Sequence, residues 1–388
     1  MKVEVKYYWL DLIRGLAALA VFLGHLRIIT FKDTPTYELD ILGKLVFFAT
    51  GFGHISVTLF FTLSGFLIIG SIHESVAAKR WAFSNYANNR LIRLWVVLIP
   101  CLVLGLIWDK IGLTFFGDSI FYSNQWKYFL NQDLPSKLTP EIFIGNVLFL
   151  QKILVPTLGS NGSLWSLTNE FWYYVTFPLL FFSSFRYYGK ATRMIFAIAS
   201  VMILFFVGKD IAINFILWLM GGISYIMLKK IKISIFDNKP ALFILTLLFL
   251  ITISLTRSKL YPAIFNNFSI GLVFSLLIPF LTRAQMRNQL LKKVSIYLSD
   301  VSYTLYLAHL PIIYVITSMI SAQSLDWSNK NFLIYLAIST TVFMYSRLLW
   351  FLFEKNTKNI KYWIQAQQTK LNVLKLKNQE EKSSNSKY

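Results

Sequence analysis

The chain has 388 residues, of which 56% are hydrophobic and only 14% are charged. Soluble globular proteins carry about 25% charged residues, so the composition excludes an ordinary soluble domain and predicts a membrane protein. The net charge of +20 would suggest nucleic acid on a soluble protein. Basic residues also accumulate in cytoplasmic loops of membrane proteins, so we expect no nucleic-acid partner. The single cysteine, Cys101, excludes an intramolecular disulfide.

Apolar runs recur along the whole chain, and several reach the length of about 20 residues that a membrane-spanning helix needs. We therefore predict an all-α, polytopic bundle of about ten membrane-spanning helices with no separate soluble domain. The first run carries Asp11 and Arg14 and is not followed by a small-residue cleavage site; it reads as a retained helix. The predicted helices lie at about residues 9–28, 54–72, 91–108, 164–183, 194–209, 211–228, 241–256, 264–282, 296–320 and 332–354.

Positive charge divides unevenly between the two sides of this bundle. With the N-terminus inside, 25 of the 38 lysines and arginines fall on the cytoplasmic side. This asymmetry predicts that both termini are cytoplasmic. Residues 142–155 are too short for a comfortable span, so we expect a re-entrant or interfacial segment within a long outer loop, 109–163. Such a loop could serve as a lid or as a platform for sugar.

The C-terminal segment is rich in lysine and serine. We predict one transmembrane domain over residues 1–354 and a basic cytoplasmic tail over residues 355–388. The tail either is solvated or contacts anionic membrane lipids.

Between Trp9 and His25, the first predicted helix carries three ionisable residues. Asp11 and Arg14 are three residues apart and can pair on one face. His25 follows Arg14 by eleven residues, which places it within about 20° of the same face and about 16 Å further along. Ionisable side chains inside a span are costly and are functional candidates by default. A structural pair between helices is the alternative, but an imidazole at this depth could also accept a proton from a hydroxyl.

Two arginines, Arg90 and Arg93, lie at the cytoplasmic mouth of the third helix. Guanidinium groups suit phosphate oxygens, so these residues are candidates for binding a phosphorylated substrate. The ordinary alternative is a basic flank of the kind found on cytoplasmic helix ends.

The start of the fourth helix places Ser163, Ser166 and Glu170 on one face. A carboxylate about two turns into the bilayer needs a partner, and we expect Glu170 to pair with His25, which lies at a similar depth. Such a carboxylate would orient the imidazole and balance its charge. Trp165 and Ser166 are candidate substrate-binding residues.

The ninth helix carries Tyr306 and His309 in mid-span, beside Pro311. Proline leaves a backbone carbonyl without its helical donor. Tyr306 and His309 are further candidates for substrate binding, although a structural role is an equal alternative for the histidine. The sequence holds no His-x-x-x-His spacing, so we expect no metal.

Five short patterns in chain order together resemble those of acyltransferase family 3, membrane proteins that acylate exported or cell-surface molecules. They read Leu-Asp-x-x-Arg-Gly with a later histidine, Phe-Phe-x-Leu-Ser-Gly-Phe, Arg-x-x-Arg, Trp-Ser-Leu-x-x-Glu and Ser-Tyr-x-Leu-Tyr-Leu-x-His-x-Pro. The resemblance covers nearly the whole chain apart from the tail. The residues that carry it are Asp11, Arg14, Gly15, His25, Phe60, Phe61, Leu63, Ser64, Gly65, Phe66, Arg90, Arg93, Trp165, Ser166, Leu167, Glu170, Ser302, Tyr303, Leu305, Tyr306, Leu307, His309 and Pro311.

The resemblance implies that His25 and Arg14 are essential and that Arg90 and Arg93 serve the acyl donor. It also implies that the co-substrate is an acyl-CoA, for which acetyl-CoA is the first expectation. The expected acceptor is a glycan or lipid-linked saccharide, and the expected location is the bacterial cytoplasmic membrane. Asp11 and Glu170 are expected to support the catalytic pair, and Arg14 to contact the donor as well.

Two other functions fit parts of the sequence. A transporter or flippase could use the polar face as a path for a glycan or lipid, with a histidine as proton relay, although we find no inverted repeat of the kind common in transporters. A non-catalytic membrane scaffold would leave the buried Arg14, His25 and Glu170 unexplained.

Overall fold

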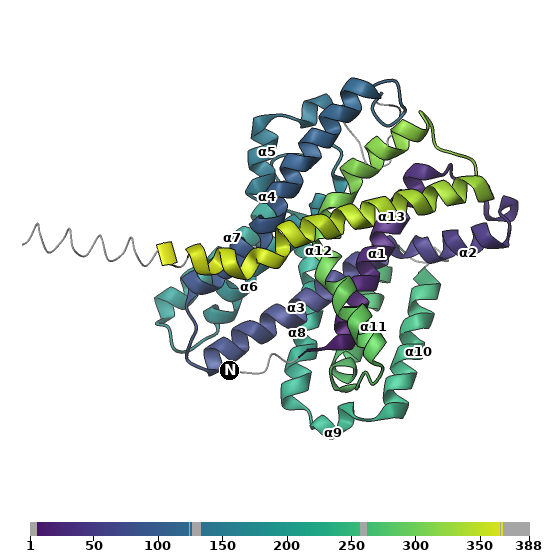
Figure 1. Ribbon diagram of the computed structural model, residues 1–388. Helices are drawn as coiled ribbons and strands as arrows, with labels where there is room; N and C mark the ends of the chain where they lie inside the picture. Colours follow the sequence, from purple (N-terminus) through teal and green to yellow (C-terminus); the bar gives the residue numbers. More distant parts are fainter. Residues whose placement is uncertain (1–5, 124, 126–132, 257–261, 365, 368–388) are drawn as a thin grey trace, which may run out of the picture.

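The computed structural model describes residues 6–123, 125, 133–256, 262–364, 366 and 367. Within these ranges the chain forms helices joined by turns, with only two isolated β-bridges (Figure 1). The all-α prediction is therefore confirmed. Most of the predicted tail, residues 355–388, lies outside the described residues.

All ten predicted helices are present, with three short helices between them. Several extend beyond the predicted ranges, and α4 and α12 begin well before their apolar runs. Asn, Gln, Lys and Arg residues there are compatible with a helix outside an apolar environment. The α-helices are α1 (Tyr8–Thr30), α2 (Ile41–Ala49), α3 (Gly53–Ala77), α4 (Phe83–Phe115), α5 (Pro140–Val147), α6 (Trp165–Ser183), α7 (Lys190–Val207), α8 (Lys209–Lys230), α9 (Ile233–Phe236), α10 (Lys239–Thr256), α11 (Ala263–Arg283), α12 (Gln289–Ile320) and α13 (Asn329–Leu352).

In the described part of the chain, nine helical stretches are long and apolar enough to cross a membrane. They include every predicted span except α6, with α2 and α3 forming one stretch. α6 falls short because its first turns hold polar residues, Asn169 and Glu170 among them. The most polar of the predicted spans is thus one that carries candidate site residues.

The first helix packs in the interior of the bundle, against α3 on one side and α12 on the other. Glycine permits this close approach: a Cβ on Gly15 would lie 2.5 Å from the Cβ of Leu298. α1 and α12 run in the same direction, since Arg14 meets Ser299 near their starts and His25 meets His309 further along. We call these two levels the Arg14 end and the His25 end.

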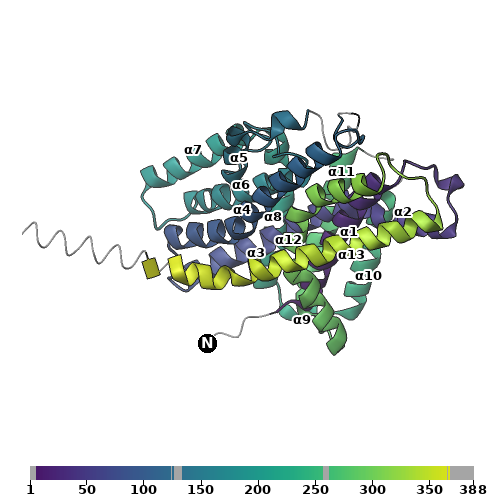
Figure 2. The same ribbon diagram turned by 45° about the horizontal axis from the view of Figure 1, so that its top comes forward.

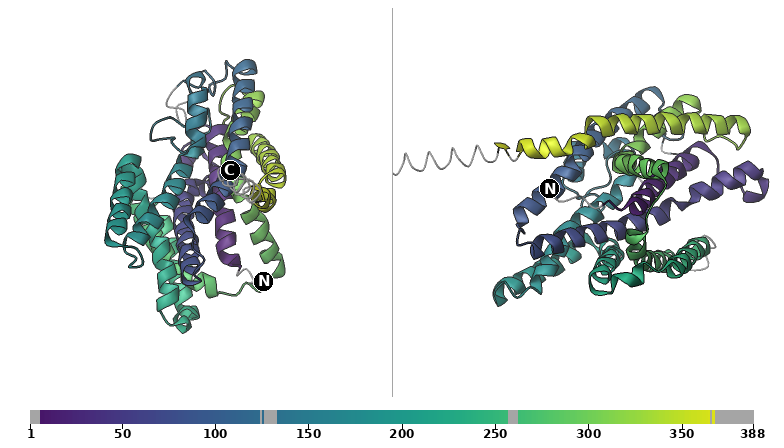
Figure 3. Two further views of the ribbon diagram at one scale, coloured as in Figure 1. Left: turned by 90° about the vertical axis from the view of Figure 1, so that its left-hand side faces the viewer. Right: turned by 60° about the horizontal axis from the view of Figure 1, so that its bottom comes forward.

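The remaining helices cover α1 and α12 unequally. α13 lies across one face, over α12 and α1, in Figures 1 and 2. α10 lies on the opposite side of the molecule from α13, as the right panel of Figure 3 shows, and packs against α11. None of the α10 side chains is buried.

The segment 142–155 does not form a full span, as predicted. It contains the end of the eight-residue helix α5 and a following turn closed by a bridge between Gln151 and Val155. Two tryptophan side chains fasten it to the bundle: Trp95 donates to the carbonyl of Val147 at 2.9 Å, and Trp172 donates to that of Phe149 at 3.0 Å. The long connection between α4 and α6 therefore packs against the helices over this stretch.

Candidate functional site

Two histidines from α1 and α12 meet at the His25 end. Nδ1 of His25 lies 2.8 Å from Nε2 of His309. The two rings are stacked, with centroids 5.1 Å apart and planes inclined by 18°. His309 is fully buried, and an edge of the Phe22 ring packs against it. The sequence singled out both histidines but did not predict that they form a pair.

The hydrogen bonds of this pair fix which nitrogen of each neutral ring carries the proton. Nδ1 of His309 lies 2.9 Å from the carbonyl oxygen of Leu305. A carbonyl oxygen only accepts, so this nitrogen is the donor and Nε2 of neutral His309 is an acceptor. Nδ1 of His25 must then donate to His309. The basic lone pair of His25 is therefore placed on its Nε2 atom.

The Arg14 end holds the predicted ion pair between Asp11 and Arg14. The guanidinium of Arg14 donates to the carboxylate of Asp11 at 3.1 Å. Ser299 on α12 contacts Arg14 directly, and its hydroxyl donates to Asp11 at 3.2 Å. Arg14 is thus held in place by two partners, one from its own helix and one from α12.

Arg90 and Arg93 of α4 lie close to the same end. Arg90 donates to Ser71 at 3.2 Å, and its guanidinium lies over the Tyr174 ring, 5.8 Å from the centroid. Arg93 is exposed and lies close enough to Arg14 for the two positive charges to oppose each other. We call Arg14, Arg90 and Arg93 the arginine cluster. Three cations gathered in this way can bind a polyanion such as a nucleotide phosphate group.

Glu170 has partners other than the one predicted for it. Its carboxylate accepts hydrogen bonds from Ser64, at 3.2 Å, and from Tyr174. The partner found for His25 is instead His309. The expected pair between His25 and Glu170 is therefore wrong.

Glu170 does not reach His25 because α6 is displaced along α12 relative to the predicted alignment of the two helices. Tyr306 lies one turn before His309 on α12, and its hydroxyl is 2.8 Å from that of Ser166. Because α6 runs antiparallel to α12, Glu170 lies one further turn towards the Arg14 end. Counting residues from predicted helix starts could not reveal this offset.

The remaining sequence candidates, Trp165 and Ser166, lie between the histidine pair and Glu170. Ser166 is buried and bonded to Tyr306, whereas Trp165 is half-buried and meets the edge of Phe61. The structure thus brings Ser166 and Tyr306 next to the histidine pair.

The structure also shows contacts of polar side chains with backbone carbonyls of α12 that the sequence interpretation did not predict. Asn161 donates to the carbonyl of Leu307 at 2.7 Å, and the hydroxyl oxygen of Ser163 lies 3.1 Å from the carbonyl oxygen of Tyr306. The signal available in the sequence was Pro311, which implies that a buried carbonyl needs a donor from elsewhere.

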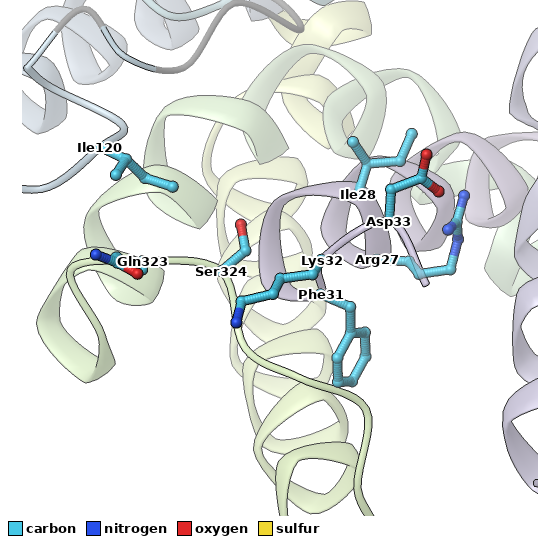
Figure 4. Close-up of a pocket in the computed structure, with 8 residues that line it drawn as sticks. All are labelled: Arg27, Ile28, Phe31, Lys32, Asp33, Ile120, Gln323 and Ser324. Atoms are coloured by element: carbon cyan, nitrogen blue, oxygen red, sulfur yellow. The ribbon is translucent and has the colours of Figure 1, made fainter. Parts of the chain in front are cut away.

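A pocket of about 380 Å³ opens at the His25 end, where α1 stops (Figure 4). Its lining comes from three segments: the end of α1 with the residues that follow, the segment after α12, and one residue of the α4–α6 connection. The ammonium group of Lys32 is paired with Asp326 at 3.0 Å. The lining residues are Arg27, Ile28, Phe31, Lys32, Asp33, Ile120, Gln323 and Ser324.

These groups form an ordered series along α1 and α12. Ser299, Tyr303, Tyr306 and His309 follow one another at intervals of three or four residues, which keeps them on one side of α12. The rise from Ser299 to His309 is about 15 Å. A cationic end is therefore joined to a basic imidazole end by a line of hydroxyl groups. Among the described residues, no group of three or more His, Cys, Asp or Glu side chains could hold a metal ion.

Comparison with known proteins identifies a family. A family model described as an acyltransferase domain, that of acyltransferase family 3, matches residues 7–350. No curated protein and no solved structure matches the chain. The matched range contains every candidate residue described above.

Proposed function

Because the chain belongs to acyltransferase family 3 and is a membrane acyltransferase, we propose that it transfers an acetyl group from acetyl-CoA to a hydroxyl of a cell-surface or exported glycan. We place it in the bacterial cytoplasmic membrane as a multi-pass protein with both termini in the cytoplasm. The observation that carries the proposal is the hydrogen bond between His25 and His309.

In the proposed reaction, His25 acts as the general base. Its Nε2 takes the proton of the acceptor hydroxyl while the oxygen attacks the thioester carbonyl. The tetrahedral intermediate then collapses and the carbon–sulfur bond breaks. The imidazolium of His25 gives its proton to the departing thiolate. The products are the acetyl ester and the free thiol of coenzyme A. Direct attack by Nε2 on the thioester, through an acetyl-histidine, is the two-step alternative.

His309 takes the role that we had expected Glu170 to fill. When His25 becomes an imidazolium, its Nδ1–H donates to His309 as a charge-assisted hydrogen bond, which is stronger than the bond of the neutral ring. The same contact holds the ring orientation before the reaction. A neutral partner stabilises the developing charge without placing a full negative charge inside the membrane.

The arginine cluster would bind the phosphates of the donor. Arg14 is held by Asp11 and Ser299, whereas Arg93 is exposed and available to a ligand. The long pantetheine arm would then run along the line of hydroxyl groups and bring the thioester to His25. Glu170, Ser166 and Tyr306 border this path.

The acceptor would enter by the pocket at the His25 end. Ile28 in its lining lies one helical turn beyond His25, so the pocket begins about one turn from the proposed base. Its lining offers donors and acceptors of the kind that bind sugar hydroxyls, namely the amide of Gln323 and the carboxylate of Asp33. The volume lies within the range of small-molecule sites.

A purified-protein assay tests the proposal. The enzyme in lipid nanodiscs is mixed with acetyl-CoA and glycan, and both thiol release and glycan mass are followed. Thiol release that depends on acceptor, with a gain of one acetyl group on the glycan, supports the proposal. Movement of glycan across a vesicle membrane without thiol release would instead support a transporter.

A further inference from the structure

Pro311 interrupts the hydrogen-bond ladder of α12 two residues after the buried histidine. In a regular helix the carbonyl of Leu307 would accept from the N–H of residue 311. Proline has no N–H, so this carbonyl lacks its helical donor, and Leu307 is itself buried. Leaving such a carbonyl unpaired inside a protein is destabilising, because the desolvation of the group is not compensated.

The missing donor comes from outside the helix. The side-chain amide of Asn161, in the segment just before α6, donates to the Leu307 carbonyl at 2.7 Å. Asn161 is 3% exposed, so water does not substitute readily. Its own oxygen accepts from the hydroxyl of Ser163 at 2.6 Å, which fixes the direction of the amide.

Neighbouring contacts hold this segment against both α4 and α12. The backbone N–H of Ser160 donates to the carboxylate of Asp109 on α4 at 2.9 Å. Ser163 also reaches the Tyr306 carbonyl of α12. The position of Asn161 is therefore set from both sides.

We propose that Asn161 is a positioning residue for the histidine pair, which rests on the proposed function of that pair. By binding the carbonyl that Pro311 leaves without a donor, it fixes the turn of α12 from Leu305 to His309. That turn sets the direction of the His309 ring, and through it the ring of His25. Proline makes the alignment depend on the connection between α4 and α6, so this connection acts on catalysis without touching the reacting atoms.

The test is a rescue experiment with three variants: Asn161→Ala, Pro311→Ala and the double variant. We expect Asn161→Ala to lower kcat by about 10²-fold, because a shift of about 1 Å at a catalytic group costs that much, with KM for both substrates nearly unchanged. Pro311→Ala restores an N–H at residue 311, which can satisfy Leu307 from within the helix. The double variant should therefore recover most of the lost kcat.

Asn169→Ala is the matched control. Asn169 is as buried as Asn161 but donates to the Tyr173 hydroxyl within α6, at 3.2 Å. We expect its kcat to stay within about threefold of wild type, since it makes no contact that fixes α12. A loss equal to that of Asn161→Ala would attribute the effect to general destabilisation and overturn the proposal.

Hydrogen–deuterium exchange over residues 305–310 reports the same contact independently of catalysis. Faster exchange in Asn161→Ala, reversed in the double variant, is the expected result. The proposal fails if exchange and kcat are both unchanged, if exchange changes while kcat does not, or if the double variant is no more active than Asn161→Ala. A wild-type protein that releases no thiol but shows the exchange pattern would refute the proposed function and leave the structural contact standing.

Discussion

α1 and α10 are both apolar enough to cross a membrane, but their surroundings are opposite. Ten residues of α1 are buried, whereas no residue of α10 is. α1 carries Asp11, Arg14 and His25 along its length, and α10 carries one charge, Lys239, at its first position. The comparison teaches that hydropathy identifies a span but not its position in the bundle. Ionisable residues together with glycine indicate which helix lies inside.

The largest effect on activity is expected when the imidazole of His25 is removed from α1. We predict that His25→Ala lowers kcat by about 10³-fold, because general-base catalysis is lost, while the protein still inserts and folds. Coenzyme A release by the variant in nanodiscs measures this. The control on the other helix is Thr246→Ala of α10, where the hydroxyl bonds only to its own helix at Leu242, and it should act like wild type. A His25→Ala variant with near wild-type activity would refute the mechanism.

The second prediction concerns the partner of that imidazole. We expect His309→Ala to lower kcat by about 10²-fold, because His25 loses the acceptor that fixes its tautomer and stabilises its charge. KM for acetyl-CoA should change little. His54→Ala is the control, since His54 is exposed at the start of α3. If both variants behave alike, the pair has no role in the chemistry.

Much of the fold could be predicted from the sequence because each membrane-spanning helix corresponds to a long run of apolar residues. All ten predicted helices are present, and the pair between Asp11 and Arg14 followed from their spacing within one helix. Contacts within a helix depend only on its geometry, which the sequence determines.

Contacts between helices were harder to predict, as Glu170 shows. Its partner depends on how far α6 is displaced along α12, and that displacement is set by the folded segment from α5 to Leu164. A residue count from the helix start contains no such information. Pro311 was recognised as freeing a carbonyl, but its donor, Asn161, lies 146 residues away along the chain. Neither contact is visible in local sequence patterns.

The third prediction compares two exposed arginines, Arg93 within α4 and Arg283 at the end of α11. Arg93→Gln on α4 should raise KM for acetyl-CoA about tenfold with little change in kcat, because a charge-assisted bond to phosphate is worth about 1.5–3 kcal/mol. Arg283→Gln on α11 is the control, since Arg283 pairs with Asp237 at 3.1 Å on the surface. Kinetics with the acetyl thioester of 3′-dephospho-CoA as donor would sharpen the result. Equal KM values for the two variants would leave Arg93 as an ordinary basic flank.

The smallest expected effect lies in the pocket beyond α1. Gln323→Ala should raise KM for the glycan about three- to fivefold and leave KM for acetyl-CoA unchanged, since one neutral hydrogen bond contributes about 0.5–1.5 kcal/mol. Gln289→Ala, exposed at the start of α12 and so at the Arg14 end, is the matched control. If the two glutamines have equal effects on the glycan, the acceptor does not enter by this pocket. An effect found for Gln323 and not for Gln289 would place the glycan at the His25 end of α12, opposite the Arg14 end proposed for acetyl-CoA.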